Sequence, residues 1–147
     1  MVEDLGEGIT SFVAGIGSGG TFSGVARYLL ERNSAIRLIG VEPEGSILNG
    51  GDSHGHEIEG IGVEFIPTFL NELPISCFAT ISDDEGFAMT RKLAKEHGIL
   101  IGSSSGAAMV GALAEVASLP AGSQVVTIFP DAGDRYLSKE IYLREAY

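Results

Sequence analysis

The chain has 147 residues, 44% hydrophobic and 20% charged, which argues against a disordered chain and suits one folded domain spanning residues 1–147. Nine basic and twenty acidic residues give a net charge of −11, so neither nucleic acid nor an anionic membrane surface is an expected partner. One cysteine allows no intrachain disulfide, and no apolar run reaches the ~20 residues that a membrane span needs. The acidic start lacks the pattern of a signal peptide, which predicts a cytoplasmic protein.

Strands and helices are predicted to alternate along the chain. Short apolar runs predict strands over residues 11–16, 37–41, 77–81, 99–101 and 125–129. Helical spacing, a capping box of Ser82 and Glu85, and glycine stops predict helices over residues 20–33, 83–97, 102–117 and 137–143. The glycine-rich stretch 44–62 is expected to be a long loop, either functional or mobile. The alternation predicts an α/β fold with a doubly wound, mostly parallel sheet and helices on both faces.

The most specific local feature is the sequence GIGSGGT at residues 15–21, between a predicted strand and a predicted helix. Glycines let a ligand approach the backbone closely, and the start of a helix offers N–H groups and a positive dipole end that suit a phosphate. Ser18 and Thr21 add hydroxyl groups. Three interpretations stay open: a dinucleotide fingerprint with Glu42 on a ribose hydroxyl, a cradle for one phosphate monoester at residues 17–21, and a tight turn without a ligand.

A second helix start rich in glycine and serine is GSSSG at residues 102–106. Its serines could cap the helix. Alternatively, one of them could aim a neutral hydroxyl into the crevice at the carboxyl ends of the strands, where folds of this class bind ligands. Two such helix starts on one sheet favour a site shared between them.

The other polar candidates have structural explanations. His54, His56 and Glu57 lie in a glycine-rich loop without fixed geometry, so a solvated loop is favoured and no metal site is predicted. Cys77 lies in an apolar strand and is expected to be a buried, inert thiol. No histidine is tied by pattern to a serine, so no nucleophilic triad is expected.

Five segments, in this order along the chain, together resemble one family. They are GSGGT at 17–21, VEPEGS at 41–46, EGIG at 59–62 followed by FIP at 65–67, GSSSGA at 102–107 and PDAGDRYLS at 130–138. They resemble the cysteine synthase (O-acetylserine sulfhydrylase) and cystathionine β-synthase family, pyridoxal-phosphate (PLP) enzymes of fold type II. The resemblance implies a homodimeric enzyme with PLP as cofactor and a small amino acid as substrate. It would convert O-acetylserine or serine and sulfide to cysteine, or use homocysteine as the nucleophile and form cystathionine.

The resemblance also implies roles for individual residues. Ser104 would face the pyridine nitrogen of the cofactor, and a neutral serine there does not force that nitrogen to be protonated. The segment Gly60, Ile61 and Gly62 would border the substrate side of the site. The cofactor phosphate would be held by Gly17, Ser18, Gly19, Gly20 and Thr21.

Two motifs of the family are absent from this sequence. The Schiff-base lysine, in a Ser-Val-Lys-Asp-Arg-like motif, and a Thr-Ser-Gly-Asn-Thr-like loop for the substrate carboxylate both belong to the N-terminal half of such enzymes. Lys92, Lys95 and Lys139 lack that motif and are predicted on exposed helix faces, so no catalytic residue is predicted in this chain. The resemblance therefore predicts the C-terminal half of an enzyme, inactive alone and completed by an N-terminal half. A dinucleotide-binding domain and a non-catalytic half-protein stay open as alternatives.

Overall fold

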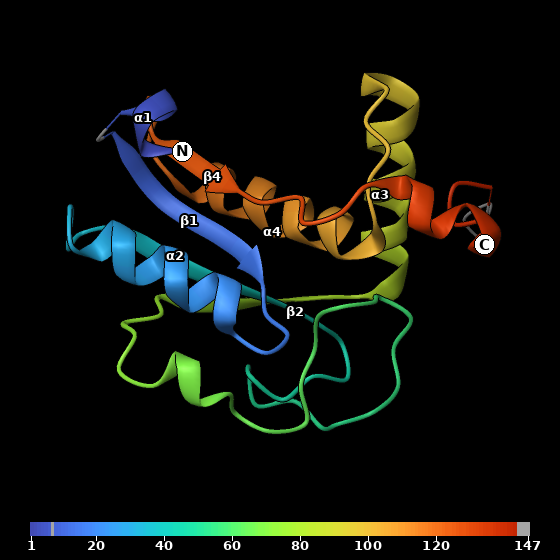
Figure 1. The fold of residues 1–147 in the computed structure, drawn as a ribbon, viewed down its shortest axis with the longest axis horizontal. Helices are drawn as coiled ribbons and strands as arrows, with labels where there is room; N and C mark the ends of the chain where they lie inside the picture. Colours follow the sequence, from blue (N-terminus) through green and yellow to red (C-terminus); the bar gives the residue numbers. More distant parts are fainter. Residues whose placement is uncertain (7, 144–147) are drawn as a thin grey trace.

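The computed structural model describes residues 1–6 and 8–143, which form a parallel β-sheet flanked by helices (Figure 1). The sheet order is β3-β2-β1-β4, with every strand pair parallel. The strands are β1 (Ile9–Gly15), β2 (Arg37–Pro43), β3 (Cys77–Ile81) and β4 (Gln124–Thr127). The helices are α1 (Val2–Leu5), α2 (Gly20–Leu30), α3 (Asp83–His97) and α4 (Ser103–Ser118), with short 3-10 helices η1 (Thr68–Leu70) and η2 (Gly133–Lys139). The predicted α/β class and parallel sheet are confirmed.

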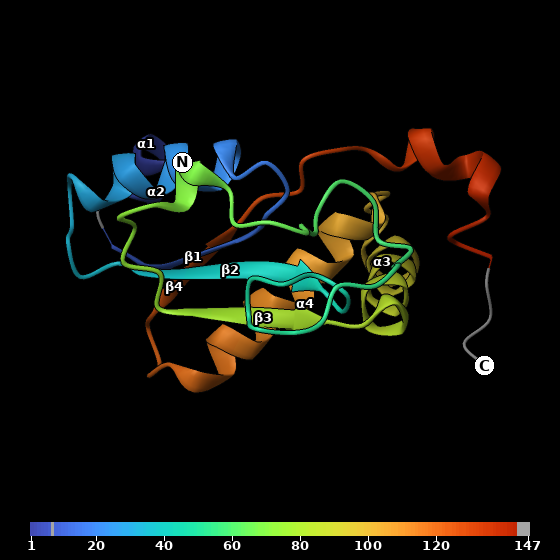
Figure 2. The same ribbon diagram turned by 90° about the horizontal axis from the view of Figure 1, so that it is seen from below.

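The sheet is covered on both faces, because successive residues of β1 enter different hydrophobic clusters (Figure 2). Phe12 packs with Phe22 of α2, their ring centroids 5.6 Å apart, whereas Val13 belongs to the cluster that contains Ala107 of α4. Burying a large side chain of this kind contributes roughly 1.5–3 kcal/mol. Strand β1 also pairs with β2 on one side and β4 on the other, so it is an inner strand of the sheet. This two-sided burial is typical of parallel sheets and explains why the second half of β1, residues 12–14, is apolar without alternation.

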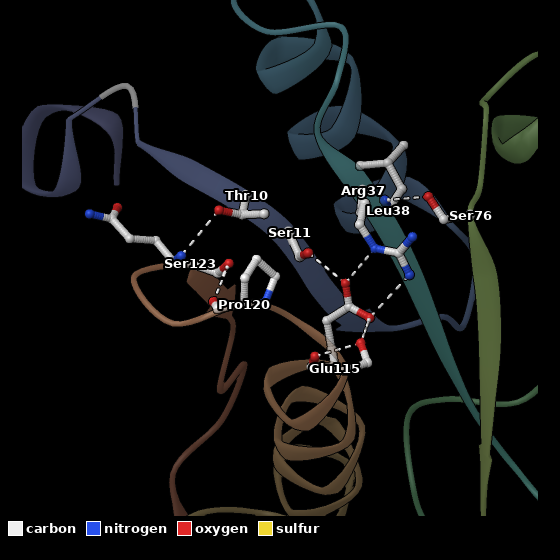
Figure 3. A network of polar contacts seen from close by, with 10 residues as sticks. Thr10, Ser11, Arg37, Leu38, Ser76, Glu115, Pro120 and Ser123 are labelled. Atoms are coloured by element: carbon white, nitrogen blue, oxygen red, sulfur yellow. Dashed lines mark hydrogen bonds and ion pairs between the residues drawn. The ribbon is translucent and has the colours of Figure 1, made fainter.

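A buried polar network fixes α4 along the sheet (Figure 3). Glu115, near the end of α4, is 6% exposed and accepts hydrogen bonds from Ser11 Oγ at 2.6 Å and Arg37 Nε at 2.7 Å. Hydrogen bonds from Arg37 lead the causes that hold the pKa of Glu115 below its ordinary value. Since Ser11 and Arg37 lie near the starts of β1 and β2, the opposite end of α4 is set at the carboxyl edge of the sheet.

Two predicted elements differ from the structure. Residues 99–101 do not join the sheet: Ile101 forms only an isolated antiparallel bridge to Ala132. Between the α3 C-cap Gly98 and the α4 N-cap Gly102, Leu100 O accepts from Gly133 N at 3.0 Å, so these residues pair with the segment after β4 and not with a strand of the sheet. The helix predicted over 137–143 is replaced by η2, which ends where Glu140 adopts a left-handed conformation with φ 54°.

Cys77 is exposed, so the prediction of a buried thiol was wrong. It lies at the start of β3, one of the two edge strands of the sheet, where only one neighbouring strand covers the backbone. The capping box at α3 is confirmed, because Ser82 accepts from Glu85 N and the Glu85 carboxylate accepts from Ser82 N. Within residues 1–6 and 8–143, no helix combines the length and apolarity needed to cross a membrane.

Candidate functional site

A cleft of about 310 Å³ opens at the carboxyl ends of the strands, which is where doubly wound folds bind ligands. Its walls come from the turn after β1, the last part of the 44–62 loop, the start of α4 and the segment after β4. Most of the residues predicted to form a site line this cleft: Gly17, Ser18, Gly19, Gly20, Thr21, Gly60, Ile61 and Ser104. The fold therefore brings together side chains that are more than 80 positions apart in the sequence.

The turn after β1 forms a backbone cradle. Gly19 is the N-cap of α2 with φ 85°, a left-handed conformation that glycine adopts without strain. A Cβ atom on Gly17 would lie 2.6 Å from the carbonyl oxygen of Gly60, so only glycine lets the two backbones meet. No side chain caps α2, which leaves its first N–H groups facing the cleft together with the positive end of the helix dipole. This arrangement can bind a phosphate.

The three serines at the start of α4 have three different surroundings. Ser103 Oγ accepts a hydrogen bond from Glu59 N at 3.2 Å, Ser104 lines the cleft at 4% exposure, and Ser105 Oγ is buried without a partner in the described part of the chain. None of them caps the helix, whose N-cap is Gly102, so the capping interpretation was wrong. The hydroxyl of Ser103 therefore binds the end of the 44–62 loop and not the backbone of its own helix.

Glu42 does not line the cleft. It is fully buried, and its carboxylate accepts hydrogen bonds from Leu48 N at 2.8 Å, Asn49 N at 3.0 Å and Thr80 Oγ1 at 3.0 Å. All three donors lie on or beside the first part of the 44–62 loop. Glu42 therefore holds this loop, and the ribose contact on which the dinucleotide interpretation depended has no support.

A second cleft, of about 470 Å³, lies on the other side of the cradle turn. Gly62, which was predicted to border the substrate, lines this second cleft and not the first. His54 and His56 line it as well. Among residues 1–6 and 8–143, no group of three or more histidine, cysteine, aspartate or glutamate side chains is placed to hold a metal ion.

The comparisons with known proteins identify the family. A family model described as "Pyridoxal-phosphate dependent enzyme" matches residues 1–131. The chain belongs to the pyridoxal-phosphate-dependent enzyme family. It is 71% identical over 143 residues to a cysteine synthase of Helicobacter pylori (strain ATCC 700392 / 26695), covering 97% of this chain and 47% of that protein. It is 50% identical to an O-acetylserine dependent cystathionine beta-synthase of Bacillus subtilis (strain 168), covering 97% of this chain and 46% of that protein.

A solved structure supports the same assignment. The crystal structure of an O-acetylserine dependent cystathionine beta-synthase from Helicobacter pylori matches with a TM-score of 0.95 and 72% identity, over 97% of this chain and 46% of that one. The resemblance to the cysteine synthase and cystathionine β-synthase family is thereby confirmed. The chain spans about half the length of the curated relatives that it matches.

The segment after β4 supplies cleft residues that were not among the predicted site residues. Asp131 and Arg135 both line the cleft. The Tyr136 hydroxyl donates to Asp131 Oδ2, and burial together with this hydrogen bond raises the pKa of Tyr136 to about 12. The other oxygen of Asp131 is buried without a partner in the described residues. The position of this segment directly after a strand of a parallel sheet was the signal that could have identified it.

No lysine of the described residues lines the cleft. Lys139 forms an ion pair with Glu59, whose side chain lies at the cleft wall, and Lys92 and Lys95 lie exposed on α3. The family's cofactor fits the residues that are present: a glycine cradle suits a phosphate, and Ser104 contributes a neutral hydroxyl to the lining of the same cleft. Apolar side chains suited to a flat ring complete the wall: Ala14, Ile61, Ala108 and Ile128.

Proposed function

We propose that this chain forms the cofactor-binding wall of a PLP-dependent enzyme that makes cysteine from O-acetylserine or serine and sulfide. The observation that carries the proposal is the single cleft that joins the cradle at residues 17–21 to Ser104 on α4. The name of the Helicobacter relative, cysteine synthase, supports the same chemistry, and the name of the Bacillus relative supports O-acetylserine as the amino-acid substrate. Because the chain spans about half of those relatives, the rest of the enzyme, including the lysine that holds the cofactor, belongs to another segment.

Each wall of the cleft has a distinct task. The backbone N–H groups at the start of α2 bind the cofactor phosphate, with the hydroxyls of Ser18 and Thr21 as further donors. Ser104 accepts or donates one neutral hydrogen bond at the pyridine nitrogen. PLP, when bound, supplies an electron sink for the α-carbon of the amino-acid substrate, and a neutral partner at its nitrogen tempers that sink, which suits replacement at the β-carbon. Gly60 and Ile61 border the substrate side.

Homocysteine in place of sulfide is a second candidate nucleophile. It is favoured by the two relatives whose names include O-acetylserine dependent cystathionine beta-synthase, one of which matches this chain at a TM-score of 0.95. The product would then be cystathionine. Homodimeric assembly and a cytoplasmic location stay predictions. A half-protein without catalytic activity stays the alternative to the enzyme proposed above.

The proposal is tested on the whole protein with a pair of matched glycine variants. In Gly17→Ala the new Cβ meets the Gly60 carbonyl, whereas Gly24→Ala places a methyl group where no atom lies within 4 Å. Losing one charged hydrogen bond to the phosphate lowers affinity by roughly tenfold or more, so PLP retention in equilibrium dialysis is expected to fall in Gly17→Ala alone. Mass spectrometry of the products with sulfide or homocysteine then identifies the nucleophile.

Two results would contradict the proposal. One is equal PLP retention by Gly17→Ala and Gly24→Ala. The other is a whole protein that retains NAD in preference to PLP, because this would reinstate a dinucleotide site at the same glycine turn.

A further inference from the structure

The last part of the 44–62 loop, residues 57–62, is called here the rim segment. Three consecutive backbone N–H groups of this segment are bound by side chains from two helix starts. Asp83, the first residue of α3, accepts from Glu57 N at 2.8 Å and from Ile58 N at 3.0 Å. Ser103, the first residue of α4, accepts from Glu59 N at 3.2 Å. The rim segment is thus attached to both helices although it has no secondary structure of its own.

The other side of the rim segment contacts the cradle turn. Gly62 N donates to Ile16 O at 2.9 Å, and the carbonyl of Gly60 lies against Gly17. Between the two sides, Ile58 is 1% exposed and packs against α3 at Gly86, where a Cβ atom would come within 2.9 Å of Ile58 Cδ1. A displacement of residues 57–59 would therefore move the Gly60 wall of the cleft relative to the cradle.

We propose that Asp83 is a positioning residue that sets the rim segment at the cleft and so determines how tightly the amino-acid substrate is held. Its carboxylate presents two oxygens to two successive N–H groups, an arrangement that asparagine can satisfy only in part. The effect of Asp83 on substrate binding rests on the proposed function, whereas its role in holding the rim segment does not. Asp83 does not line the cleft, so it acts through the rim segment and not on the substrate itself.

An aspartate in the first turn of a helix also interacts favourably with the helix dipole, and this simpler role has to be separated from the positioning role. Asp84 provides the matched control. It lies in the same first turn and carries the same charge, but it is exposed and none of its side-chain atoms bonds the rim segment. Asp83→Ala and Asp84→Ala therefore remove the same dipole interaction, and only the first removes the contact with the rim segment.

The first measurement is hydrogen–deuterium exchange over residues 57–59 in the whole protein, which needs neither cofactor nor substrate. Loss of a hydrogen bond to a charged group predicts exchange about tenfold faster or more in Asp83→Ala, a smaller change in Asp83→Asn, and wild-type exchange in Asp84→Ala. Ser103→Ala is expected to release the Glu59 amide alone. Equal exchange in Asp83→Ala and Asp84→Ala would overturn the proposal.

The second measurement is steady-state kinetics of the PLP-loaded whole enzyme. Asp83→Ala is expected to raise KM for the amino-acid substrate several-fold, with a smaller change in kcat and unchanged PLP retention, because the cradle itself is intact. Asp83→Asn should restore part of the loss. Faster exchange in Asp83→Ala without any rise in KM over Asp84→Ala would overturn the positioning role. If the wild-type protein neither retains PLP nor turns over, the proposed function fails, and the exchange measurement still decides whether Asp83 holds the rim segment.

Discussion

Replacing Glu42 with glutamine tests whether this buried carboxylate holds the 44–62 loop. The amide keeps one acceptor oxygen, which can serve Asn49 and Thr80, and places an NH2 group against the Leu48 N–H, which now donates to Oε2 at 2.8 Å. Leaving a buried N–H without an acceptor costs about 1–3 kcal/mol, so Glu42→Gln is expected to lower the free energy of unfolding by about 2 kcal/mol. The loss is large because Leu48 is only 9% exposed and water cannot readily replace the lost acceptor.

The assay is urea unfolding of the whole protein, with Glu44→Gln as the matched control. Glu44 lies two positions along the chain, is exposed, and removes the same negative charge when it is replaced. An exposed substitution of this kind is expected to change the free energy of unfolding by less than about 0.5 kcal/mol. If Glu42→Gln and Glu44→Gln have the same stability, the Glu42 carboxylate does not hold the loop.

Two further predictions concern pH. The pKa of Glu115 is lowered in the folded state, so its ionised form stabilises the fold above the unfolded pKa of about 4.5. This stabilisation is lost as pH falls through the folded pKa. Glu115→Gln should therefore lower the free energy of unfolding at neutral pH and make it less dependent on pH in the acid range, as measured by urea unfolding at a series of pH values. The pKa of Tyr136 is raised from 10 to about 12, so its contribution to stability is complete below pH 10 and is lost as pH rises through about 12. Burial also raises the pKa of Tyr142, so ultraviolet titration should show late-ionising tyrosine absorbance that Tyr136→Phe reduces but does not abolish. Unchanged titration curves in these variants would contradict the assignments.

Local features of the site could be predicted from the sequence. The glycine turn at residues 15–21 lies between a strand and a helix, and both elements are visible as short-range patterns, so the cradle was expected where it is found. Ser104 was singled out by the resemblance, since three adjacent serines give no local reason to choose one of them. The structure separates them by their surroundings: Ser103 faces the rim segment, Ser104 the cleft and Ser105 the interior.

The contacts that position the site could not be predicted in this way. Asp83 binds amides 25 and 26 positions earlier in the chain, and Ser103 binds one 44 positions earlier. The partner in each case is a backbone N–H group, which every residue except proline carries, so the sequence holds no matching side chain to identify. Cys77 illustrates the same difficulty, because the exposure of β3 depends on the strand order and not on the composition of the strand.

The negative charge of the chain and its proposed phosphate site are reconciled by the local partners of the acidic groups. A net charge of −11 opposes an anionic ligand, yet the acids near the cleft are largely engaged: Glu59 is paired with Lys139, Asp131 accepts from Tyr136, and Asp83 accepts from two backbone amides. The groups that form the cradle are backbone N–H donors at the start of α2. The positive end of the helix dipole attracts an anion only within about one turn of this end. Phosphate binding here depends on this short-range field, so releasing Glu59 with Lys139→Met should weaken PLP retention even though Lys139 does not line the cleft.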